Sequence, residues 1–219
     1  MVFKGRYDLI IFDWDGTLID SIPRILTCFR ATFAAAGSPT PDDHRIKATI
    51  GLPLRHAFQQ LTGREDAVFL DRLCAGYRHF WLDAGIPISP LFAGVNLTLE
   101  RISRLGTLLA VATGKSRAGL ERDLGHHGLD GYFATSRCGG ETAAKPAPAM
   151  LEDILRTLGV GPERALMVGD SILDMEMAAN AGMDAIGVCT GSHTEPDLQR
   201  WNPRCCIADV TLLDSFVWP

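Results

Sequence analysis

The sequence lacks the signatures of several protein classes. None of its six cysteines forms a Cys-x-x-Cys pair, so we expect neither a thiolate zinc site nor a redox dithiol. No apolar run approaches the roughly 20 residues that cross a bilayer. Asp8 and Asp13 bracket the first of these runs, which leaves no readable signal peptide. We therefore expect a cytoplasmic protein with reduced cysteines and no membrane partner.

A basic excess is also missing. Lys and Arg number 21 against 26 Asp and Glu, a formal net charge of -5, whereas nucleic-acid-binding domains carry clustered positive charge. The 219 residues, 47% of them hydrophobic, are enough to bury a core without disulfides, which excludes disorder, collagen and coiled coil. We expect no nucleic-acid partner, and either a monomer or a homodimer.

Short, uninterrupted apolar runs alternate with helix-like stretches along the chain. Such runs are typical of strands buried on both faces, and their alternation with helices predicts a parallel sheet. We therefore predict an α/β fold with a Rossmann-like parallel sheet. The predicted strands are Tyr7–Phe12, Leu108–Ala112, Ala165–Val168 and Ala185–Val188, and the predicted helices are Arg117–Leu124, Ala147–Leu158 and Ile172–Ala181.

One long segment breaks this alternation. From about Ile22 to Leu82 the apolar residues recur at helical spacing, and no buried strand is evident. We predict an all-helical insertion between the first and second strands, which accounts for a length above that of one average domain. The expected division is an α/β core of residues 1–20 and 86–219 and a helical part of residues 21–85.

The most informative motif, Asp13-Trp14-Asp15-Gly16-Thr17, follows the first predicted strand. Parallel α/β sheets bind ligands at the carboxyl ends of their strands. Two carboxylates placed two residues apart repel each other unless a hard cation such as Mg²⁺, which prefers oxygen ligands, compensates them. Gly16 permits a sharp departure from the strand. The alternative interpretation is that both aspartates only start a turn.

The second predicted strand is followed by Thr113-Gly114-Lys115-Ser116. This run resembles the end of a nucleotide P-loop, but Leu109 stands where that pattern needs its first glycine. The Thr113 hydroxyl and the free N–H groups at the start of the next helix form a natural seat for a phosphate oxygen. Ser116 is equally well explained as a helix N-cap.

Two further signals lie close to the same predicted edge. Lys145 precedes Pro146 before a predicted helix, and Asp170 and Asp174 follow a buried strand. Alone, Lys145 is more simply a solvated lysine, and Asp174 a helix cap. Together with Asp13 and Asp15, however, the two aspartates would place four negative charges in one crevice. A divalent cation and a lysine would compensate them, which predicts a cation-dependent site for an anionic oxygen substrate.

These motifs, in this order, resemble the haloacid dehalogenase superfamily, in its phosphoglycolate phosphatase-like branch with a helical cap. The resemblance implies that residues 21–85 are the cap and that the remainder is a phosphatase core. It further implies that Asp13 is a nucleophile that forms an aspartyl-phosphate. Asp15 would protonate the leaving alkoxide and then activate water, while Thr113 and Lys145 would hold the transferring phosphoryl group.

The resemblance also implies a metal and a substrate class. Mg²⁺ would be ligated by Asp13, the backbone carbonyl of Asp15 and Asp170, with Asp174 in support. The expected activity is a Mg²⁺-dependent phosphomonoesterase that acts on a small phosphorylated metabolite, such as phosphoglycolate or a sugar phosphate. A phosphomutase of the β-phosphoglucomutase type and a non-catalytic phosphate-binding regulator are the alternatives.

Substrate contacts are expected from the motif loops and from the cap. Gly16, Thr17 and Gly114 belong to the motif loops. In the helical part, Arg45 and Gly51 lie in the segment best placed to descend over the active site, where Arg45, Lys47 and Arg55 could meet a second anionic group of the substrate. The alternative is that these cations form a solvated helix face.

Overall fold

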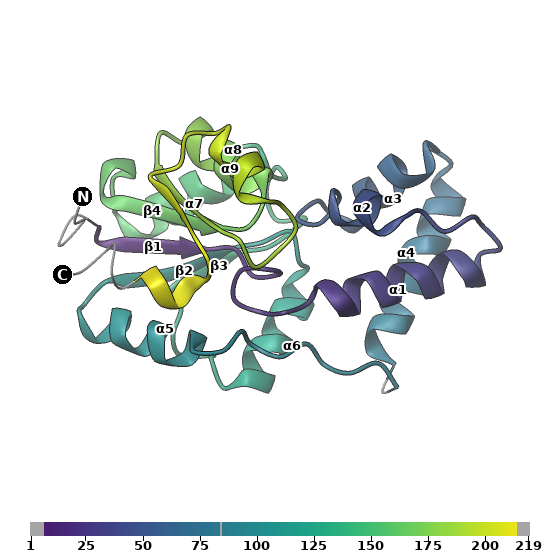
Figure 1. Cartoon of the computed structure of the whole chain (residues 1–219), viewed down its shortest axis with the longest axis horizontal. Helices are drawn as coiled ribbons and strands as arrows, with labels where there is room; N and C mark the ends of the chain where they lie inside the picture. The colour runs from purple at the N-terminus through teal and green to yellow at the C-terminus, as the bar shows by residue number, and fades with distance from the viewer. Residues whose placement is uncertain (1–6, 84, 214–219) are drawn as a thin grey trace.

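The computed structural model describes residues 7–83 and 85–213, and its centre is a six-stranded parallel sheet (Figure 1). The strand order is β3-β2-β1-β4-β5-β6, so the first strand is central. The strands are β1 (Leu9–Phe12), β2 (Leu108–Ala112), β3 (Thr135–Arg137), β4 (Ala165–Gly169), β5 (Asp184–Val188) and β6 (Cys205–Ile207). The parallel α/β prediction is confirmed.

Helices cover both faces of this sheet because successive residues of a strand point to opposite sides. Ile10 and Phe12 of β1 pack into one buried cluster with α5 (Val95–Arg104) and α6 (Arg117–His127). Leu9 and Ile11 pack into the other with α7 (Ala149–Leu158) and α8 (Ile172–Asn180). Figure 1 shows these pairs of helices on opposite sides of the sheet. The short helix α9 (Glu195–Gln199) and the 3-10 helices Pro162–Arg164 and Val210–Leu213 complete this part.

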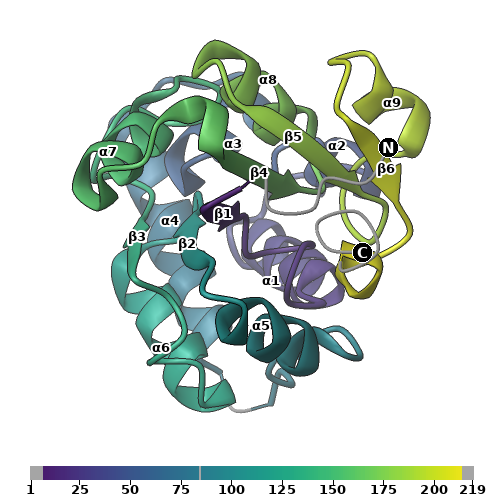
Figure 2. The ribbon, with the colours of Figure 1, turned by 90° about the vertical axis from the view of Figure 1, so that its left-hand side faces the viewer.

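Four helices between β1 and α5 lie beyond one end of the sheet, and we call them the helical group. In Figure 2, which looks along the molecule from its other end, they lie behind the strands. They bury a separate apolar cluster that includes Phe29, Phe33 and Phe58. No residue from 22 to 82 lies in a strand, as the periodicity predicts. The helical group comprises α1 (Ile22–Ala35), α2 (Asp43–Lys47), α3 (Leu54–Thr62) and α4 (Ala67–Leu82).

The elements β3, β6 and α5 were not predicted from the sequence. The β3 sequence is Thr-Ser-Arg, which carries no apolar signal because this strand lies at the sheet edge and all three residues are only half-buried. The β6 strand is likewise a three-residue edge strand. No helix within residues 7–83 and 85–213 is long and apolar enough to cross a membrane.

Candidate active site

Asp13, Lys145 and Asp174 meet at the carboxyl end of the central strands. Asp13 follows β1 directly, and its backbone N–H donates to the Val168 carbonyl of β4. The Lys145 ammonium lies 2.8 Å from Asp13 Oδ1 and 2.6 Å from Asp174 Oδ1. All three side chains are almost completely buried. Lys145 is therefore part of the carboxylate cluster and not a solvated lysine.

Asp170 completes the cluster from the end of β4. Its Oδ1 accepts from the Thr17 hydroxyl at 2.9 Å, and its Oδ2 accepts from the backbone N–H of Ser192 at 2.7 Å. Gly16, with φ +85°, passes so close that a Cβ there would lie 2.7 Å from Asp170 Oδ2. Burial, followed by the charge of Asp174, raises the pKa of Asp170 to about 6, against the opposing effect of the hydrogen bonds. The ionised form of Asp170 is therefore disfavoured in this fold, and a cation beside it would stabilise that form.

The donor set of this cluster suits a hard cation. Carboxylate oxygens of Asp13, Asp170 and Asp174 all lie within 4.8 Å of one another. Burial raises the pKa of Asp13 well above its usual range, against the lowering effect of Lys145. Asp13 Oδ1 is buried without a hydrogen bond, since the ammonium nearby lies outside hydrogen-bonding geometry. An oxygen cluster with one unsatisfied acceptor fits Mg²⁺.

The Asp174 carboxylate, like that of Asp170, accepts three hydrogen bonds. Its Oδ1 accepts from Lys145, and its Oδ2 accepts from the Ser171 hydroxyl at 2.6 Å and the Ser171 N–H at 3.1 Å. The latter contacts form a capping box at the start of α8. Asp174 is therefore both a helix-capping residue and a member of the cluster, so the two interpretations of the sequence are compatible.

The Asp15 carboxylate points to a different set of partners. Its Oδ1 lies 3.0 Å from Lys115 Nζ, and the same ammonium lies 3.1 Å from Asp123 Oδ2. Trp14 Nε1 donates to that Asp123 oxygen at 3.1 Å. These ion pairs outweigh burial and leave the pKa of Lys115 raised. The Asp15 carboxylate therefore lies apart from the cluster of Asp13, Asp170 and Asp174.

Three residues of the site, Lys115, Asp123 and Ser192, were not predicted from the sequence. Lys115 was visible only as part of an incomplete P-loop pattern. Asp123 is the seventh residue of α6, where a charged side chain is expected to be exposed, but it is buried. Ser192 reaches Asp170 from the loop after β5, and nothing in its own sequence context signals that contact.

Three glycines bring separate backbone segments into direct contact beside Thr113. A Cβ on Gly114 would lie 2.3 Å from the carbonyl oxygen of Gly51, and one on Gly139 would lie 2.2 Å from that of Gly114. Thr113 itself is buried, and its hydroxyl accepts from the Lys115 N–H at 3.2 Å. Gly51 therefore joins the helical group to the loops that follow β2 and β3.

The structure does not bring Arg45 into this assembly. Its side chain is exposed, and Nη2 donates to the Leu61 carbonyl at 3.1 Å, which ties it to the end of α3. It does not line the cavity over the site. The expectation that Arg45 contacts substrate therefore lacks support, because its helix is capped by Asp42 with Arg45 facing α3.

A cavity of about 480 Å³ lies between the helical group and the motif loops. Asp13 and Asp15 line it, together with four cationic side chains from three helices and the loop before α6. These cations are Arg55, Arg78, Lys115 and Arg122. Although the whole chain has a net charge of -5, the lining of this cavity is net positive.

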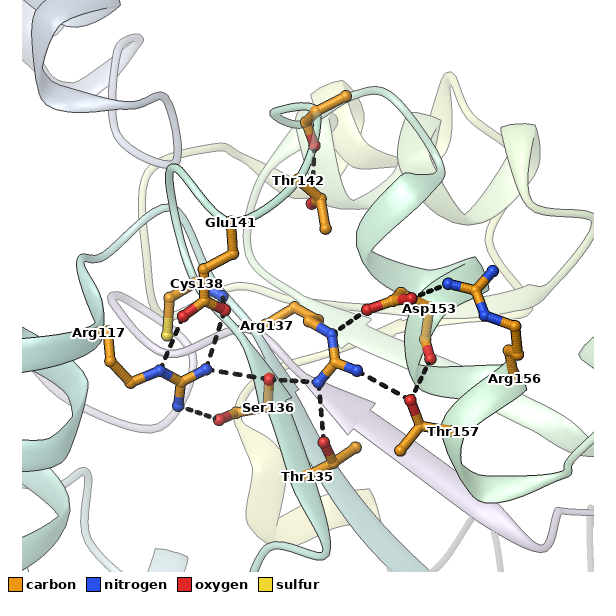
Figure 3. Close-up of polar contacts among 11 residues, drawn as sticks. Arg117, Thr135, Ser136, Arg137, Cys138, Glu141, Thr142, Asp153, Arg156 and Thr157 are labelled. Atoms are coloured by element: carbon orange, nitrogen blue, oxygen red, sulfur yellow. Dashed lines mark hydrogen bonds and ion pairs between the residues drawn. The ribbon is translucent and has the colours of Figure 1, made fainter.

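The loop that carries Lys145 is anchored at its start by a polar network (Figure 3). The Arg117 guanidinium makes a two-pronged contact with Glu141, at 2.8 and 2.9 Å, and also donates to the Ser136 hydroxyl at 2.6 Å. Glu141 in turn accepts from the Cys138 N–H at 2.9 Å. On the other side of β3, Arg137 contacts Asp153 of α7. The network fixes the edge strand and the start of the loop that leads to Lys145.

Comparison with known proteins agrees with this geometry. Residues 10–188 match the haloacid dehalogenase-like hydrolase family. The chain is 36% identical over 208 residues to a probable phosphatase IndB of Dickeya dadantii, covering 91% of this chain and 88% of the relative. It is 32% identical to a phosphoglycolate phosphatase of Vibrio cholerae, covering 86% and 87%.

A solved structure supports the same assignment. A putative haloacid dehalogenase-like hydrolase from Bacteroides fragilis superimposes with a TM-score of 0.87 at 32% identity, covering 94% of this chain and 99% of that one. With a family match across most of the chain and phosphatases among its relatives, the chain belongs to the haloacid dehalogenase-like hydrolases and is a phosphatase of their phosphoglycolate phosphatase-like branch.

Proposed function

We propose that this phosphatase is a Mg²⁺-dependent phosphomonoesterase that hydrolyses a small phosphorylated metabolite through an aspartyl-phosphate on Asp13. The observation that carries the proposal is the separation of two neighbouring carboxylates. Asp13 lies in the buried cluster with Lys145, whereas Asp15 lies with Lys115. Two carboxylates in different surroundings can take different roles.

The metal would be held by Asp13, Asp170 and the backbone carbonyl of Asp15, with Asp174 in support. Bound Mg²⁺ supplies positive charge that reduces the repulsion between a carboxylate nucleophile and a phosphate dianion. The buried unsatisfied oxygen of Asp13 and the raised pKa of Asp170 support this assignment.

The residues of this chain would divide the reaction into two displacements. An Asp13 carboxylate oxygen attacks phosphorus, and the bond from phosphorus to the substrate oxygen breaks. Asp15, protonated at this stage, gives its proton to that leaving oxygen. In the second step Asp15 takes a proton from water, the water oxygen attacks phosphorus, and the Asp13–phosphate bond breaks to release inorganic phosphate.

Lys145 and Thr113 would hold the phosphoryl oxygens during both steps. Phosphoryl transfer depends mainly on positioning and on charge stabilisation, which a buried ammonium supplies. Desolvation lowers the pKa of Lys145, but Asp13 and Asp174 outweigh it and leave the pKa raised, so the side chain stays protonated. We further propose that residues 21–85 act as the cap and that the Gly51 segment closes over the site.

The experiment is a panel of phosphate esters assayed for release of inorganic phosphate. Wild type is measured with Mg²⁺ and with EDTA, beside Asp13→Asn and a matched control, Asp130→Asn, at an exposed aspartate outside the site. We expect wild type to turn over substrate only with Mg²⁺. Asp13→Asn should lose this activity, and the control Asp130→Asn should retain it. Activity that survives both EDTA and Asp13→Asn would disprove the mechanism, and transfer of phosphate to a sugar instead of water would indicate a mutase.

A further inference from the structure

We infer that the substrate is the phosphate ester of a flat, ring-bearing alcohol of roughly nucleoside size. We further infer that the Tyr77 hydroxyl donates a hydrogen bond to the organic part of this substrate. The inference rests on the proposed phosphomonoesterase activity and narrows the substrate class. It comes from the cavity above Asp13 and Asp15, whose size, lining and charge all bear on what fills it.

The size of the cavity is the first observation. Its volume of about 480 Å³ lies within the range, roughly 300–1,000 Å³, of sites that enclose drug-sized ligands. A two- or three-carbon acid would leave most of this space to water. Much of the wall is apolar, with contributions from Ile25, Phe29, Ile50, Leu54, Tyr77 and Trp81. An apolar wall of this extent favours a ligand body that is itself largely apolar.

The aromatic rings of that wall are held in place by one another. Tyr77 and Trp81 stack with centroids 5.8 Å apart and planes at 19°, and Phe29 packs against Tyr77 at 5.0 Å. Trp81 also lies under the Arg24 guanidinium at 4.6 Å and the Lys115 ammonium at 4.5 Å. Rings fixed in this way form a preorganised surface, on which a flat ligand ring gains stacking or edge contacts.

Tyr77 adds a polar group to this surface. Its hydroxyl makes no hydrogen bond within residues 7–83 and 85–213, although the ring packs against Phe29, Phe58 and Trp81. Burial raises the pKa of Tyr77, as do the nearby Cys28 and Asp15, so the hydroxyl keeps its proton and remains a donor. A donor without a partner, on the wall of the cavity, is suited to an oxygen or nitrogen acceptor of the ligand.

The charge of the lining limits how much additional charge the ligand carries. Four cationic side chains and two carboxylates line the cavity. Lys115 is already paired with Asp15 and Asp123, and Arg55 with Asp71 at 3.0 Å. Counted together with Asp71 and Asp123, the four cations face four carboxylates, so the cavity has no formal excess of positive charge to attract a second anionic group on the organic part of the ligand.

The test compares kcat/KM for three probes: uridine 5'-monophosphate, 4-nitrophenyl phosphate and 2-phosphoglycolate. We expect the two ring-bearing esters to be at least about tenfold better substrates than 2-phosphoglycolate. A preference for 2-phosphoglycolate overturns the inference and leaves the phosphatase proposal intact. If no probe is hydrolysed, equilibrium binding of uridine 5'-monophosphate and 2-phosphoglycolate in Mg²⁺ decides, and equal or weaker binding of the nucleotide overturns the inference.

Two variants test the wall directly. Tyr77→Phe removes only the hydroxyl and should raise KM for uridine 5'-monophosphate about threefold to tenfold, the equivalent of one hydrogen bond, with 2-phosphoglycolate unaffected. Tyr132→Phe, outside the cavity, is the matched control. Leu54→Trp, which fills the cavity, should reduce turnover of the ring-bearing esters selectively, and retained hydrolysis of 2-phosphoglycolate would show that the variant folds. Equal effects of Tyr77→Phe and Tyr132→Phe, or equal losses on all probes in Leu54→Trp, overturn the inference.

Discussion

Lys115 and Asp15 form an ion pair of 3.0 Å in which the two side chains are only 9% and 14% exposed. The pair keeps the Asp15 carboxylate beside the cavity and away from the cluster of Asp13, Asp170 and Asp174. Asp123, fixed by Trp14, holds the lysine from its other side. The position of the proposed acid–base residue is thus set by a partner on a different strand end, 100 residues further along the chain.

Replacing Lys115 with Met should lower kcat about 10–100-fold, since a correctly positioned acid–base group contributes roughly 10²–10⁴-fold. It also leaves Asp123 buried without its cation, so we expect a lower melting temperature. Lys115→Arg should lower kcat and the melting temperature less than Lys115→Met does. Lys47→Met on α2 serves as the control. If Lys115→Met matches wild type in kcat, Asp15 does not need this partner.

The proposed metal site predicts a change in Mg²⁺ requirement. Asp170→Asn removes one anionic ligand but retains the shape of the side chain, so the Mg²⁺ concentration for half-maximal activity should rise at least about tenfold. The measurement is a Mg²⁺ titration of phosphate release. Asp130→Asn, at an exposed position, should titrate like wild type. An unchanged Mg²⁺ requirement in Asp170→Asn would place the metal elsewhere.

The raised pKa of Asp170 predicts a pH dependence of stability in the absence of metal. Because the pKa is about 6 in the fold and 3.8 in the unfolded chain, the folded protein holds an extra proton between these values. The free energy of unfolding should therefore fall as pH rises from about 4 to 6. At about 1.36 kcal/mol per pKa unit, this interval corresponds to at most about 3 kcal/mol.

Thermal unfolding at several pH values, in EDTA and in Mg²⁺, checks this. Asp13, whose pKa is also raised, adds to the same trend, so the contribution of Asp170 is the difference between wild type and Asp170→Asn. Mg²⁺ binds the ionised carboxylates and should restore stability above pH 6. If wild type and Asp170→Asn depend on pH identically in EDTA, Asp170 does not carry the effect.

Gly114→Ala should impair substrate turnover more than stability. The added methyl group would lie 2.3 Å from the Gly51 carbonyl oxygen, so the segment of the helical group around Gly51 must shift. We expect kcat/KM to fall at least about tenfold with a small change in melting temperature. Gly131→Ala, where a methyl group meets no atom within 4 Å, is the matched control. Equal kinetics in the two variants would show that the contact does not matter for activity.

The sequence alone predicted the parallel sheet and the sheet edge at which the candidate site lies, because buried strands and the residues after them leave strong local signals. It could not predict how the polar residues pair. Lys115 and Asp123 are charged residues in a helical context, and only the fold shows that α6 turns Asp123 inward toward Trp14. The contact between Arg45 and substrate stays a prediction: the charge and position of Arg45 suggested it, but in the structure the side chain donates to the Leu61 carbonyl.

The contact of Gly51, Gly114 and Gly139 has a consequence for how new specificities arise in this enzyme. Because Gly51 meets Gly114 through main-chain atoms, this contact does not depend on which side chains line the cavity. Residues such as Leu54 and Tyr77 are then free to vary without disturbing it. A library that randomises those wall positions while keeping the three glycines would explore new substrates on an unchanged catalytic frame.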